Sequence, residues 1–445
     1  MARTVVIIGG GAAGIGAAGA AKATDRDNNV VVYTEFEDVG YSPCGIPYVH
    51  GKEIPEFQAL FLADKQTYAD AGIDIRYETK VNSFDPAAKT VLVEGEGEVS
   101  YDTLIIATGF DYKDPGVPGS GLGGLYYVKN IRAAMEWDKV LDTVKRAVVV
   151  EASALGLEMV TALAHRGIDT HLIDPHPWAL GELCDPDIAA PVQESWGEMG
   201  VTMHWNTTLT GFLDDGDGQV RGVATSDGEI PAELVVIATH KVPNNVLAVA
   251  AGLKVGSTGG VVIDDHMSTS AADVWAAGDV CEVPHGVGGL PLQGLTGSHA
   301  YAQGKVAGTN AGGGERAYQP VYVPWGMVAG KWMIGGVAFG EVAATALGIP
   351  HVIGQAVGIS RARYYPGVKQ VRVKLLAEPG TLRLIGAQMV GGEGIKERAD
   401  FLAVAVRKGI TLYDLATMEN VYSPPIGALN EPISVAAQNG VAEFG

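Results

Sequence analysis

The sequence predicts an α/β protein with two Rossmann-like dinucleotide-binding units and a C-terminal α+β region. Two observations indicate this fold class: a strand–turn–helix–strand pattern occurs twice along the chain, and the first of the two turns is rich in glycine. The length supports several domains, because 445 residues exceed what one hydrophobic core holds, which is about 250–300 residues.

The first unit begins with the β-branched run Val5–Ile8, which is typical of a buried parallel strand. The motif Gly9-x-Gly11-x-x-Gly14 follows this strand and opens a helix, and Glu35 lies about 20 residues further on, after the next strand. In this context Gly9 permits a tight turn, Gly11 lets a pyrophosphate approach the backbone, and Gly14 lets the helix pack closely on the strand. We expect Glu35 to accept hydrogen bonds from ribose hydroxyls.

The second unit repeats this pattern with different turn residues. Ala147–Val150 is the expected strand, Leu155–Arg166 the helix and His171–Ile173 the next strand. The repeat extends further along each half. Leu104–Ile106 is an apolar strand followed by Ala107, Thr108 and Gly109, and its counterpart is Val235–Ile237, followed by Ala238, Thr239 and His240.

The last part of the chain, from about Tyr318, lacks a nucleotide-binding turn. Val371–Leu376 and Leu384–Val390 have the pattern of two antiparallel strands, and Ala399–Lys408 that of a helix. We therefore expect a first domain formed by residues 1–113 and 243–317, a second formed by 114–242, and a third formed by 318–445.

Composition excludes several classes of partner. The net charge of -20 disfavours nucleic acid. No apolar run reaches the roughly 18 residues of a membrane span, and no leader precedes the first strand, so we expect no membrane association. Three cysteines are too few for a disulfide framework and suggest the reducing cytoplasm. We predict no metal site.

Several motifs resemble those of the FAD-dependent pyridine nucleotide–disulfide oxidoreductases, over nearly the whole chain. The stretch Asp38–Tyr48, which contains Cys44, is similar to the single-cysteine branch of coenzyme A–disulfide reductases, NADH oxidases and sulfur reductases. Ala107–Gly109 and Val274–Asp279 resemble the family's other flavin segments, and the family's aspartate at Asp279 bonds the ribityl chain of the flavin. The resemblance implies FAD, with candidate binding residues Gly9, Gly11, Ala13, Gly14, Glu35, Pro43, Val81, Ala107, Thr108, Gly109, Gly278 and Asp279.

Cys44 is the candidate redox residue that the resemblance indicates. No Cys-x-x-x-x-Cys pair exists, so Cys44 has to cycle through a mixed disulfide, a persulfide or a sulfenic acid. A helix start near Cys44 would lower the pKa of its thiol and favour this chemistry. The alternative is a buried, inert cysteine, which is how we interpret Cys184 and Cys281.

Two tyrosines and one histidine are further catalytic candidates. Tyr422 lies in a Tyr-Ser-Pro-Pro segment and Tyr364 in a Tyr-Tyr-Pro-Gly segment, where we favour Tyr364 over Tyr365. The resemblance implies a homodimer in which these tyrosines approach the active cysteine, and aromatic packing at the dimer interface is the alternative. His299 is either a substrate contact or a structural histidine.

The nicotinamide and coenzyme A sites depart from the family pattern. Glu151 and Ser153 replace two glycines of the second turn, and His240 replaces another glycine. We therefore expect NAD(P)H binding to be weakened or lost, with retained weak binding as the competing interpretation. Ala23 and Asn430 stand where relatives that use coenzyme A carry basic residues, which puts this substrate in doubt, although Lys22 and Arg26 lie close to the first of these positions.

These features predict a flavin enzyme that passes electrons between FAD and a small thiol, disulfide or sulfur compound through Cys44. The electron donor is a nicotinamide, a protein or the substrate thiol itself. One alternative is an NAD(P)H oxidase or peroxidase that uses a cysteine sulfenic acid. Another is a flavin-bearing electron-transfer subunit of a larger complex.

Overall fold

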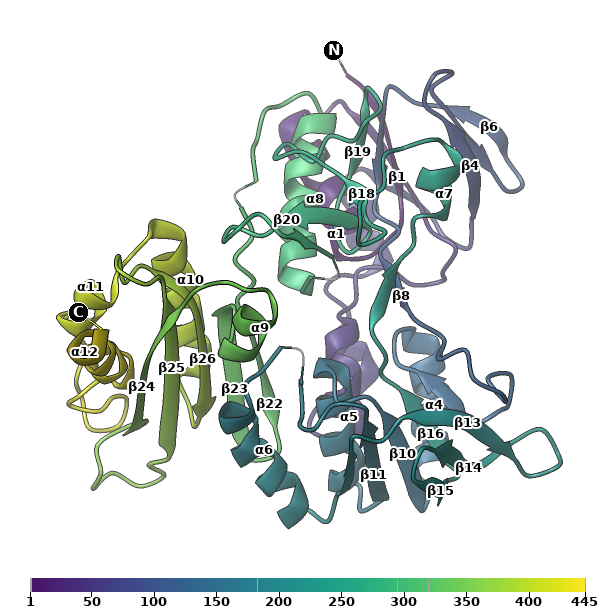
Figure 1. Ribbon diagram of the computed structural model, residues 1–445. Coiled ribbons are helices and arrows are strands. Elements are labelled where there is room, and N and C mark those ends of the chain that lie inside the picture. Colours follow the sequence, from purple (N-terminus) through teal and green to yellow (C-terminus); the bar gives the residue numbers. More distant parts are fainter. Residues whose placement is uncertain (1, 182, 294, 319, 445) are drawn as a thin grey trace.

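The computed structural model describes residues 2–181, 183–293, 295–318 and 320–444, which form three lobes, each built around a five-stranded sheet (Figure 1). Two sheets are parallel and belong to the two predicted units, and the third is antiparallel. The α/β class and the order of two Rossmann-like units followed by an α+β region are therefore confirmed.

The first sheet has the strand order β19-β7-β1-β2-β3, and every neighbouring pair is parallel. Helices α1 (Ala12–Thr24) and α8 (Gly297–Ala311) pack tightly against each other beside it (Figure 1). A Cβ atom on Gly304 or Gly308 would lie 2.1 Å from the carbonyl oxygen of Ala13 or Ala17, so glycine sets this close approach. The strands are β1 (Thr4–Ile8), β2 (Asn29–Tyr33), β3 (Ile73–Arg76), β7 (Thr103–Ile106) and β19 (Val274–Ala276).

The second sheet has the equivalent order β9-β16-β10-β11-β12, again all parallel. Each of these two sheets is accompanied by a three-stranded antiparallel sheet, β4-β5-β6 in the first unit and β13-β14-β15 in the second. The elements are β4 (Val81–Asp85), β5 (Thr90–Val93), β6 (Gly97–Ser100), β9 (Leu125–Tyr127), α4 (Ile131–Leu141), β10 (Arg146–Val150), α5 (Ala154–His165), β11 (Asp169–Asp174), α6 (Pro186–Glu198), β12 (Thr202–Trp205), β13 (Leu209–Asp214), β14 (Val220–Thr225), β15 (Gly228–Pro231) and β16 (Leu234–Ile237).

Two short strands connect the first two units. β8 (Phe110–Tyr112) leaves the first unit, β17 (Lys241–Pro243) returns to it, and the two pair antiparallel. The hydrogen bonds around them are reciprocal, since Lys113 N donates to His240 O at 3.0 Å and Asn244 N donates to Gly109 O at 3.0 Å. The crossing segments thus keep the ends of the two repeats next to each other.

The third sheet, β22-β23-β26-β25-β24, is antiparallel and packs against α10 and α12. Its strands β25 and β26 contain the two predicted at 371–376 and 384–390, and α10 contains the predicted helix. The elements are β22 (Trp325–Ala329), β23 (Trp332–Ala338), α9 (Glu341–Ala346), β24 (Val352–Ile359), β25 (Gln370–Ala377), β26 (Leu384–Gly391), α10 (Ile395–Lys408), α11 (Leu412–Ala416) and α12 (Pro432–Phe444).

The segment after β2 contains the 3-10 helix η1 (Pro43–Gly45) and α2 (Ile46–His50), and it packs on the second unit. The buried His50 ring lies 3.2 Å from the Asp138 carboxylate and 3.0 Å from the Tyr126 hydroxyl. The remaining elements are η2 (Phe57–Leu60), α3 (Lys65–Asp70), α7 (Val246–Ala250), β18 (Val261–Val262), β20 (Cys281–Pro284) and β21 (Pro291–Leu292). No helix in the described part of the chain combines the length and apolar character needed to cross a bilayer.

Candidate functional site

Most of the predicted flavin residues lie at one edge of the first sheet. Its strands are parallel, so their carboxyl ends meet at the same edge, which is where α/β sheets bind ligands. β1 is followed by Gly9, β2 by Glu35, β7 by Ala107 and β19 by Gly278. The structure thus brings together Gly9, Gly11, Ala13, Gly14, Glu35, Ala107, Thr108, Gly109, Gly278 and Asp279.

The first turn has the geometry that its glycines predict. Gly9 has a φ of +111°, and a Cβ atom there would lie 2.3 Å from the Ala107 carbonyl oxygen. A Cβ atom on Gly14 would lie 1.9 Å from the Gly9 oxygen. Gly11 differs, because it precedes α1 without a side-chain cap and has no atom within 4 Å of its Cβ position. The helix therefore presents free N–H groups beside open space, which suits the pyrophosphate of a dinucleotide.

The other three segments complete this edge. The Thr108 hydroxyl donates to the Asn244 carbonyl at 2.7 Å, which ties the segment after β7 to the returning strand β17. Gly278 has a φ of +85° and donates its N–H to the Gln303 Oε1 at 2.9 Å. The Gln303 Nε2 is buried and has no hydrogen-bond partner among the described residues. A polar ligand at this edge would supply the acceptor that this amide lacks.

Glu35, Val81 and Pro43 have different surroundings. Glu35 is exposed, and its carboxylate lies 4.0 Å from the Lys80 ammonium, so it is open to a ribose. Val81 is buried at the start of β4. Pro43 is the first residue of η1 and orders the turn that carries Cys44.

Cys44 lies in η1, next to the start of α2, and solvent reaches its side chain. Protein atoms nevertheless surround the thiol on most sides, and this burial raises its pKa, with the Glu158 carboxylate adding to the shift and the Lys241 ammonium opposing it. The expected lowering of this pKa is wrong, because desolvation of the thiol and the nearby carboxylates outweigh the groups that favour the thiolate. Lys241 is the nearby cation that favours the thiolate.

Sequence analysis did not identify four residues near Cys44 as candidate site residues. They are Tyr48, Tyr112, Glu158 and Lys241. Tyr48 donates a hydrogen bond to the Glu158 carboxylate at 3.3 Å, and burial raises the pKa of Glu158 to about 7. Burial also raises the pKa of Tyr112, and the charge of Cys44 adds to this shift. Lys241 lies 2.9 Å from the Asp279 carboxylate. The available signal was that Glu158 is the only acid in the mainly apolar helix α5, and that Lys241 directly follows the altered residue His240.

The other two cysteines are buried, as expected for structural residues. Burial raises the pKa of both Cys184 and Cys281, so neither thiol ionises near neutral pH. His299 is also buried, its Nδ1 lies 2.7 Å from the Thr296 hydroxyl, and burial lowers the pKa of its ring. It is therefore neutral at pH 7.

Tyr364 and Tyr422 lie together in the third lobe. Their hydroxyl groups are 3.0 Å apart, and the residues are 75% and 44% exposed. Among the described residues no hydrogen bond or ring contact joins either one to Cys44 of the same chain. Tyr365 is less exposed than Tyr364 and lies beside the Arg361 guanidinium.

The second turn follows the same backbone path as the first. Glu151 has a φ of +71° where the first turn has Gly9, and a Cβ atom on Gly156 would lie 2.1 Å from the Glu151 oxygen. The Ser153 Oγ accepts the Gly156 N–H at 3.2 Å and donates to the Ala238 carbonyl at 2.7 Å. Ser153 thus turns its side chain into the turn and caps α5, which occupies one of the N–H groups at the start of that helix.

Of the basic residues near the first helix, Lys22 has a structural role. Its ammonium donates to the carbonyl oxygens of Arg26 at 3.0 Å and Asn28 at 2.6 Å, which holds the loop between α1 and β2. Ala23 and Arg26 are exposed. Binding a phosphate of coenzyme A at Lys22 would compete with these bonds.

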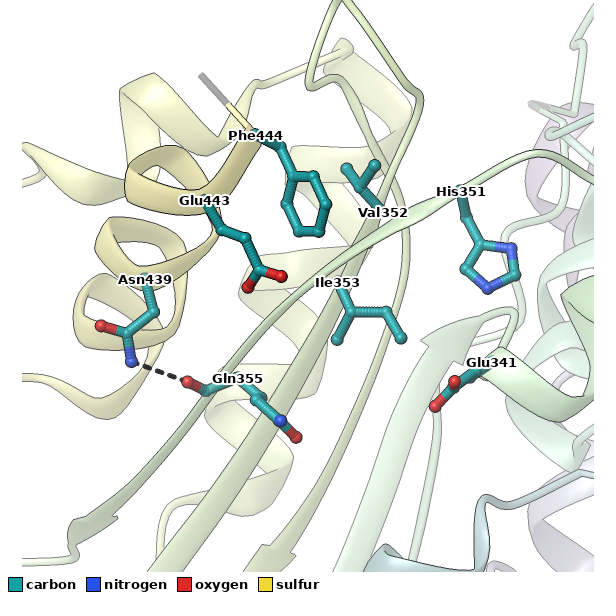
Figure 2. Close-up of a pocket in the computed structure, with 8 residues that line it drawn as sticks. All are labelled: Glu341, His351, Val352, Ile353, Gln355, Asn439, Glu443 and Phe444. Carbon is teal, nitrogen blue, oxygen red and sulfur yellow. Dashed lines mark hydrogen bonds between the residues drawn. The ribbon is translucent and has the colours of Figure 1, made fainter.

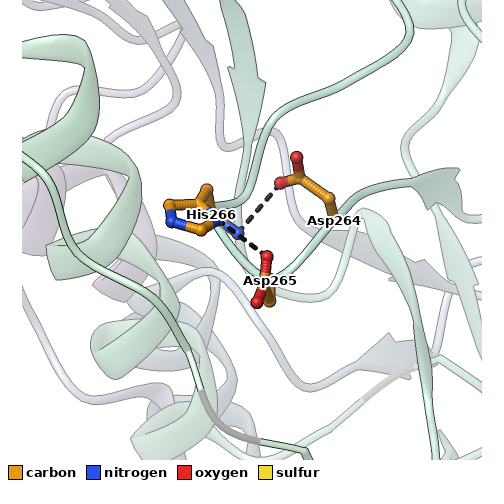
Figure 3. A group of neighbouring side chains, drawn as sticks. All are labelled: Asp264, Asp265 and His266. Atoms are coloured by element: carbon orange, nitrogen blue, oxygen red, sulfur yellow. Dashed lines mark hydrogen bonds and ion pairs between the residues drawn. The ribbon is translucent and has the colours of Figure 1, made fainter.

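Two polar features lie away from the edge described above. An open pocket of about 640 Å³ is lined by Glu341, His351, Asn439 and Glu443 of the third lobe, together with β24 (Figure 2). Asp264, Asp265 and His266 form an exposed group in the first unit (Figure 3). The Asp264 carboxylate accepts the N–H groups of His266 and Ser268 at 2.9 and 2.8 Å, so this group stabilises a turn.

Comparison with known proteins identifies the family. The model of the pyridine nucleotide-disulphide oxidoreductases matches residues 3–304, and the model of their dimerisation domain matches residues 326–431. The chain is 34% identical over 447 residues to an NADH oxidase of Methanocaldococcus jannaschii, with 99% of both chains covered. It is 31% identical over 452 residues to an NAD(P)H coenzyme A polysulfide/persulfide reductase of Pyrococcus horikoshii, with 98% of both covered.

A solved structure supports the same assignment. The chain matches an NAD-dependent persulfide reductase from A. fulgidus with a TM-score of 0.94 and 30% identity, over 99% of this chain and 83% of that one. The names of these relatives include NAD, NADH or NAD(P)H, so the comparisons give no support to the expectation that nicotinamide binding is weakened or lost. The chain belongs to the pyridine nucleotide-disulphide oxidoreductases, a family of FAD-binding enzymes, and it carries their dimerisation domain.

Proposed function

We propose that this protein is an FAD-dependent reductase that transfers electrons from NAD(P)H to a small disulfide or persulfide through Cys44. The observation that carries the proposal is the position of this cysteine. Cys44 is the one solvent-accessible cysteine among the described residues, and it lies where the segment after β2 packs on helix α5 of the second unit. A thiol placed between the two nucleotide-binding units suits electron transfer from one to the other.

The first sheet supplies the proposed FAD site. Gly9, Gly11 and Gly14 form the turn that would receive the pyrophosphate. Glu35 would bind the ribose and Asp279 the ribityl chain, as the family resemblance implies. The open space beside Gly11 and the unpartnered Gln303 amide fit such a ligand. When bound, FAD supplies two electrons at a time to the sulfur chemistry of Cys44.

The proposed reaction at Cys44 has two steps. The Cys44 thiolate attacks a substrate disulfide, which forms a mixed disulfide and releases one thiolate. Two electrons and a proton then cleave this mixed disulfide into the second thiol and the Cys44 thiolate. Glu158 is suited to hold the proton, because burial raises its pKa to about 7 and Tyr48 donates a hydrogen bond to it.

NAD(P)H is the proposed donor because the second turn keeps the backbone geometry of the first. Ser153 occupies the Gly156 N–H, but the preceding N–H groups of α5 have no partner within the helix and remain able to bind phosphate. Glu151 brings an acidic residue to the same turn, and a carboxylate close to the phosphates would weaken this binding. We therefore propose functional NAD(P)H binding of reduced affinity.

A homodimer completes the proposed active site. Besides Tyr364 and Tyr422, the third lobe exposes several large apolar side chains, and an interface between two copies would cover them. The two tyrosines of one subunit would then face Cys44 of the other and protonate the leaving thiolate. The apolar residues are Phe401, Val404, Val421, Ile426 and Leu429.

We propose three domains: the first formed by residues 1–113 and 243–317, the second by 114–242 and the third by 318–445.

Replacing Cys44 tests this function. We expect C44S to keep FAD and to remain reducible by NADH, but to lose disulfide reduction by at least about a thousandfold. The matched control is C281A, which removes a buried thiol and should retain activity. If C44S still reduces disulfides, the proposal is wrong. If C44S still passes electrons at an unchanged rate to a protein acceptor, a flavin electron-transfer subunit fits better.

An NAD(P)H oxidase is the second candidate, and the similarity to the NADH oxidase of M. jannaschii favours it. In that reaction Cys44 would cycle through a sulfenic acid. Oxygen consumption with NADH, measured with and without a disulfide substrate, separates the two. Oxygen uptake much faster than disulfide reduction, and lost in C44S, would establish the oxidase.

A further inference from the structure

Lys241 occupies an unusual position between the two units. It is the first residue of β17, the strand that returns from the second unit to the first. Its ammonium donates to the Asp279 carboxylate at 2.9 Å and to the Leu295 carbonyl at 3.1 Å, and it lies 4.3 Å from the centre of the Phe110 ring. Its side chain is 30% exposed and that of Asp279 only 8%. These three contacts hold the Lys241 side chain at the edge of the first sheet where we propose that FAD binds.

These contacts give Lys241 two effects at this edge. First, it fixes the orientation of Asp279, because a charge-assisted hydrogen bond restricts a carboxylate that has little access to water. Second, its positive charge favours the Cys44 thiolate, which the carboxylates of Glu158 and Asp279 disfavour. Removing this charge therefore makes the thiolate less favourable.

We propose that Lys241 is a positioning residue that orients Asp279 for the flavin and stabilises negative charge on both the Cys44 thiolate and the reduced cofactor. The inference rests on the proposed FAD site. Two-electron reduction of a flavin at neutral pH leaves negative charge on the ring system, so a nearby ammonium raises its midpoint potential. Lys241 is the first residue of β17, which begins directly after the second unit. It therefore connects the end of that unit to the proposed flavin site.

The role of Lys241 is tested with three matched variants: Lys241→Met, Lys241→Arg and Lys129→Met. Lys129 is the control because it lies over the same Phe110 ring, at 5.0 Å, but pairs with Asp111 at 2.6 Å instead of Asp279. The midpoint potential of the FAD-bound protein is measured by equilibration with redox dyes. We expect K241M to lower the ratio of reduced to oxidised flavin at least about tenfold, which is about 30 mV for a two-electron couple. K241R keeps the positive charge and should lower the potential less than K241M does, and K129M should stay within about twofold of the native protein.

A second measurement does not depend on the cofactor. It can therefore test the role of Lys241 even if K241M does not bind FAD. The rate at which iodoacetamide alkylates Cys44 at pH 7 is measured in the FAD-free protein, with C44S as the blank. We expect K241M to react at least about threefold more slowly, because less of the thiol is ionised, and K241R to restore the rate.

Unchanged alkylation in K241M, or an unchanged potential in K241M with FAD bound, would overturn the inference. A failed inference is distinguishable from a failed function. If C44S abolishes disulfide reduction while K241M changes neither readout, only the role of Lys241 is wrong. If C44S retains disulfide reduction, the proposed function is wrong whatever K241M does.

Discussion

The two nucleotide-binding turns of this chain follow nearly the same backbone path with different residues. The first residue of each turn donates its N–H to the neighbouring strand at 2.9 Å, from Gly9 to Tyr33 and from Glu151 to Ile173. Both first residues have positive φ, and both turns end at a glycine whose Cβ would overlap the first residue's carbonyl oxygen. The fold therefore requires a positive φ at the first position of the turn and a glycine at the sixth.

The third position of the turn differs. Gly11 has open space around its Cβ position, whereas Ser153 places its Oγ between the Gly156 N–H and the Ala238 carbonyl. A side chain is thus compatible with the fold at this position. Glycine at the third position therefore serves the ligand, while the glycine at the sixth serves the packing of helix on strand.

The largest effects are expected at the sixth position. In Gly14→Ala the new Cβ would overlap the Gly9 oxygen, and in Gly156→Ala the Glu151 oxygen, so either turn must distort. We expect G14A to purify without FAD, and G156A to keep FAD but lose at least about tenfold in affinity for NADH. Flavin absorbance and NADH titration measure the two effects. Normal FAD content in G14A would contradict the assignment of this turn.

The third position of the first turn should affect only the ligand. Because Gly11 has open space, Gly11→Ala should leave the stability of the fold unchanged while its methyl group displaces the pyrophosphate, with a loss of FAD affinity of about tenfold. Gly19→Ala is the matched control, since Gly19 lies further along α1 and also has open space. Reconstitution of the FAD-free protein with FAD gives both affinities. Equal affinities in the two variants would show that Gly11 has no special role.

The converse change should improve the second site. Ser153→Gly frees the Gly156 N–H for a phosphate, so we expect NADH to bind about threefold to tenfold more tightly. The loss of the helix cap should lower the free energy of unfolding by only a few tenths of a kcal/mol, about as much as serine-to-glycine changes at caps usually do. Stopped-flow reduction of the flavin at varied NADH concentration measures the affinity. Weaker binding would mean that the Ser153 hydroxyl itself contacts the nucleotide.

Glu158 is expected to affect stability and its dependence on pH, rather than ligand binding. Burial raises the pKa of Glu158 from 4.5 to about 7, so the folded state binds more protons than the unfolded state between these values. Stability therefore falls as the pH rises through this window. In Glu158→Gln the loss of unfolding free energy between pH 5 and pH 8 should be smaller by about 1–3 kcal/mol. Urea unfolding at both pH values checks this, and identical losses in both proteins would refute it.

Most of the fold was predictable from the sequence because its signals are local. The apolar runs 5–8 and 147–150 became the central strands of the two parallel sheets, and the glycine pattern from Gly9 to Gly14 placed a turn before a helix. Segments such as β8 and β17 have only three residues each, so their pairing depends on tertiary contacts that no periodicity reports.

The surroundings of Cys44 were less predictable, because they too depend on tertiary contacts. Glu158 lies on a helix of the second unit and Lys241 on a connecting strand, and only the packing of the two units brings both near Cys44. Ser153 was expected to weaken NAD(P)H binding, but the sequence does not report that its hydroxyl points into the turn and donates to the Ala238 carbonyl. The role of the tyrosine pair in the third lobe depends on a second subunit, which the sequence of one chain does not position.

In the proposed reaction, electrons pass from a nicotinamide to a disulfide through the flavin and Cys44. This route is tested by an anaerobic absorbance experiment on the native protein and on C44S, with NADH added first and a small disulfide second. We predict that NADH bleaches the flavin in both proteins, and that the disulfide restores the oxidised spectrum only in the native one. Bleaching by dithionite but not by NADH or NADPH, or reoxidation of C44S by the disulfide, would contradict this route.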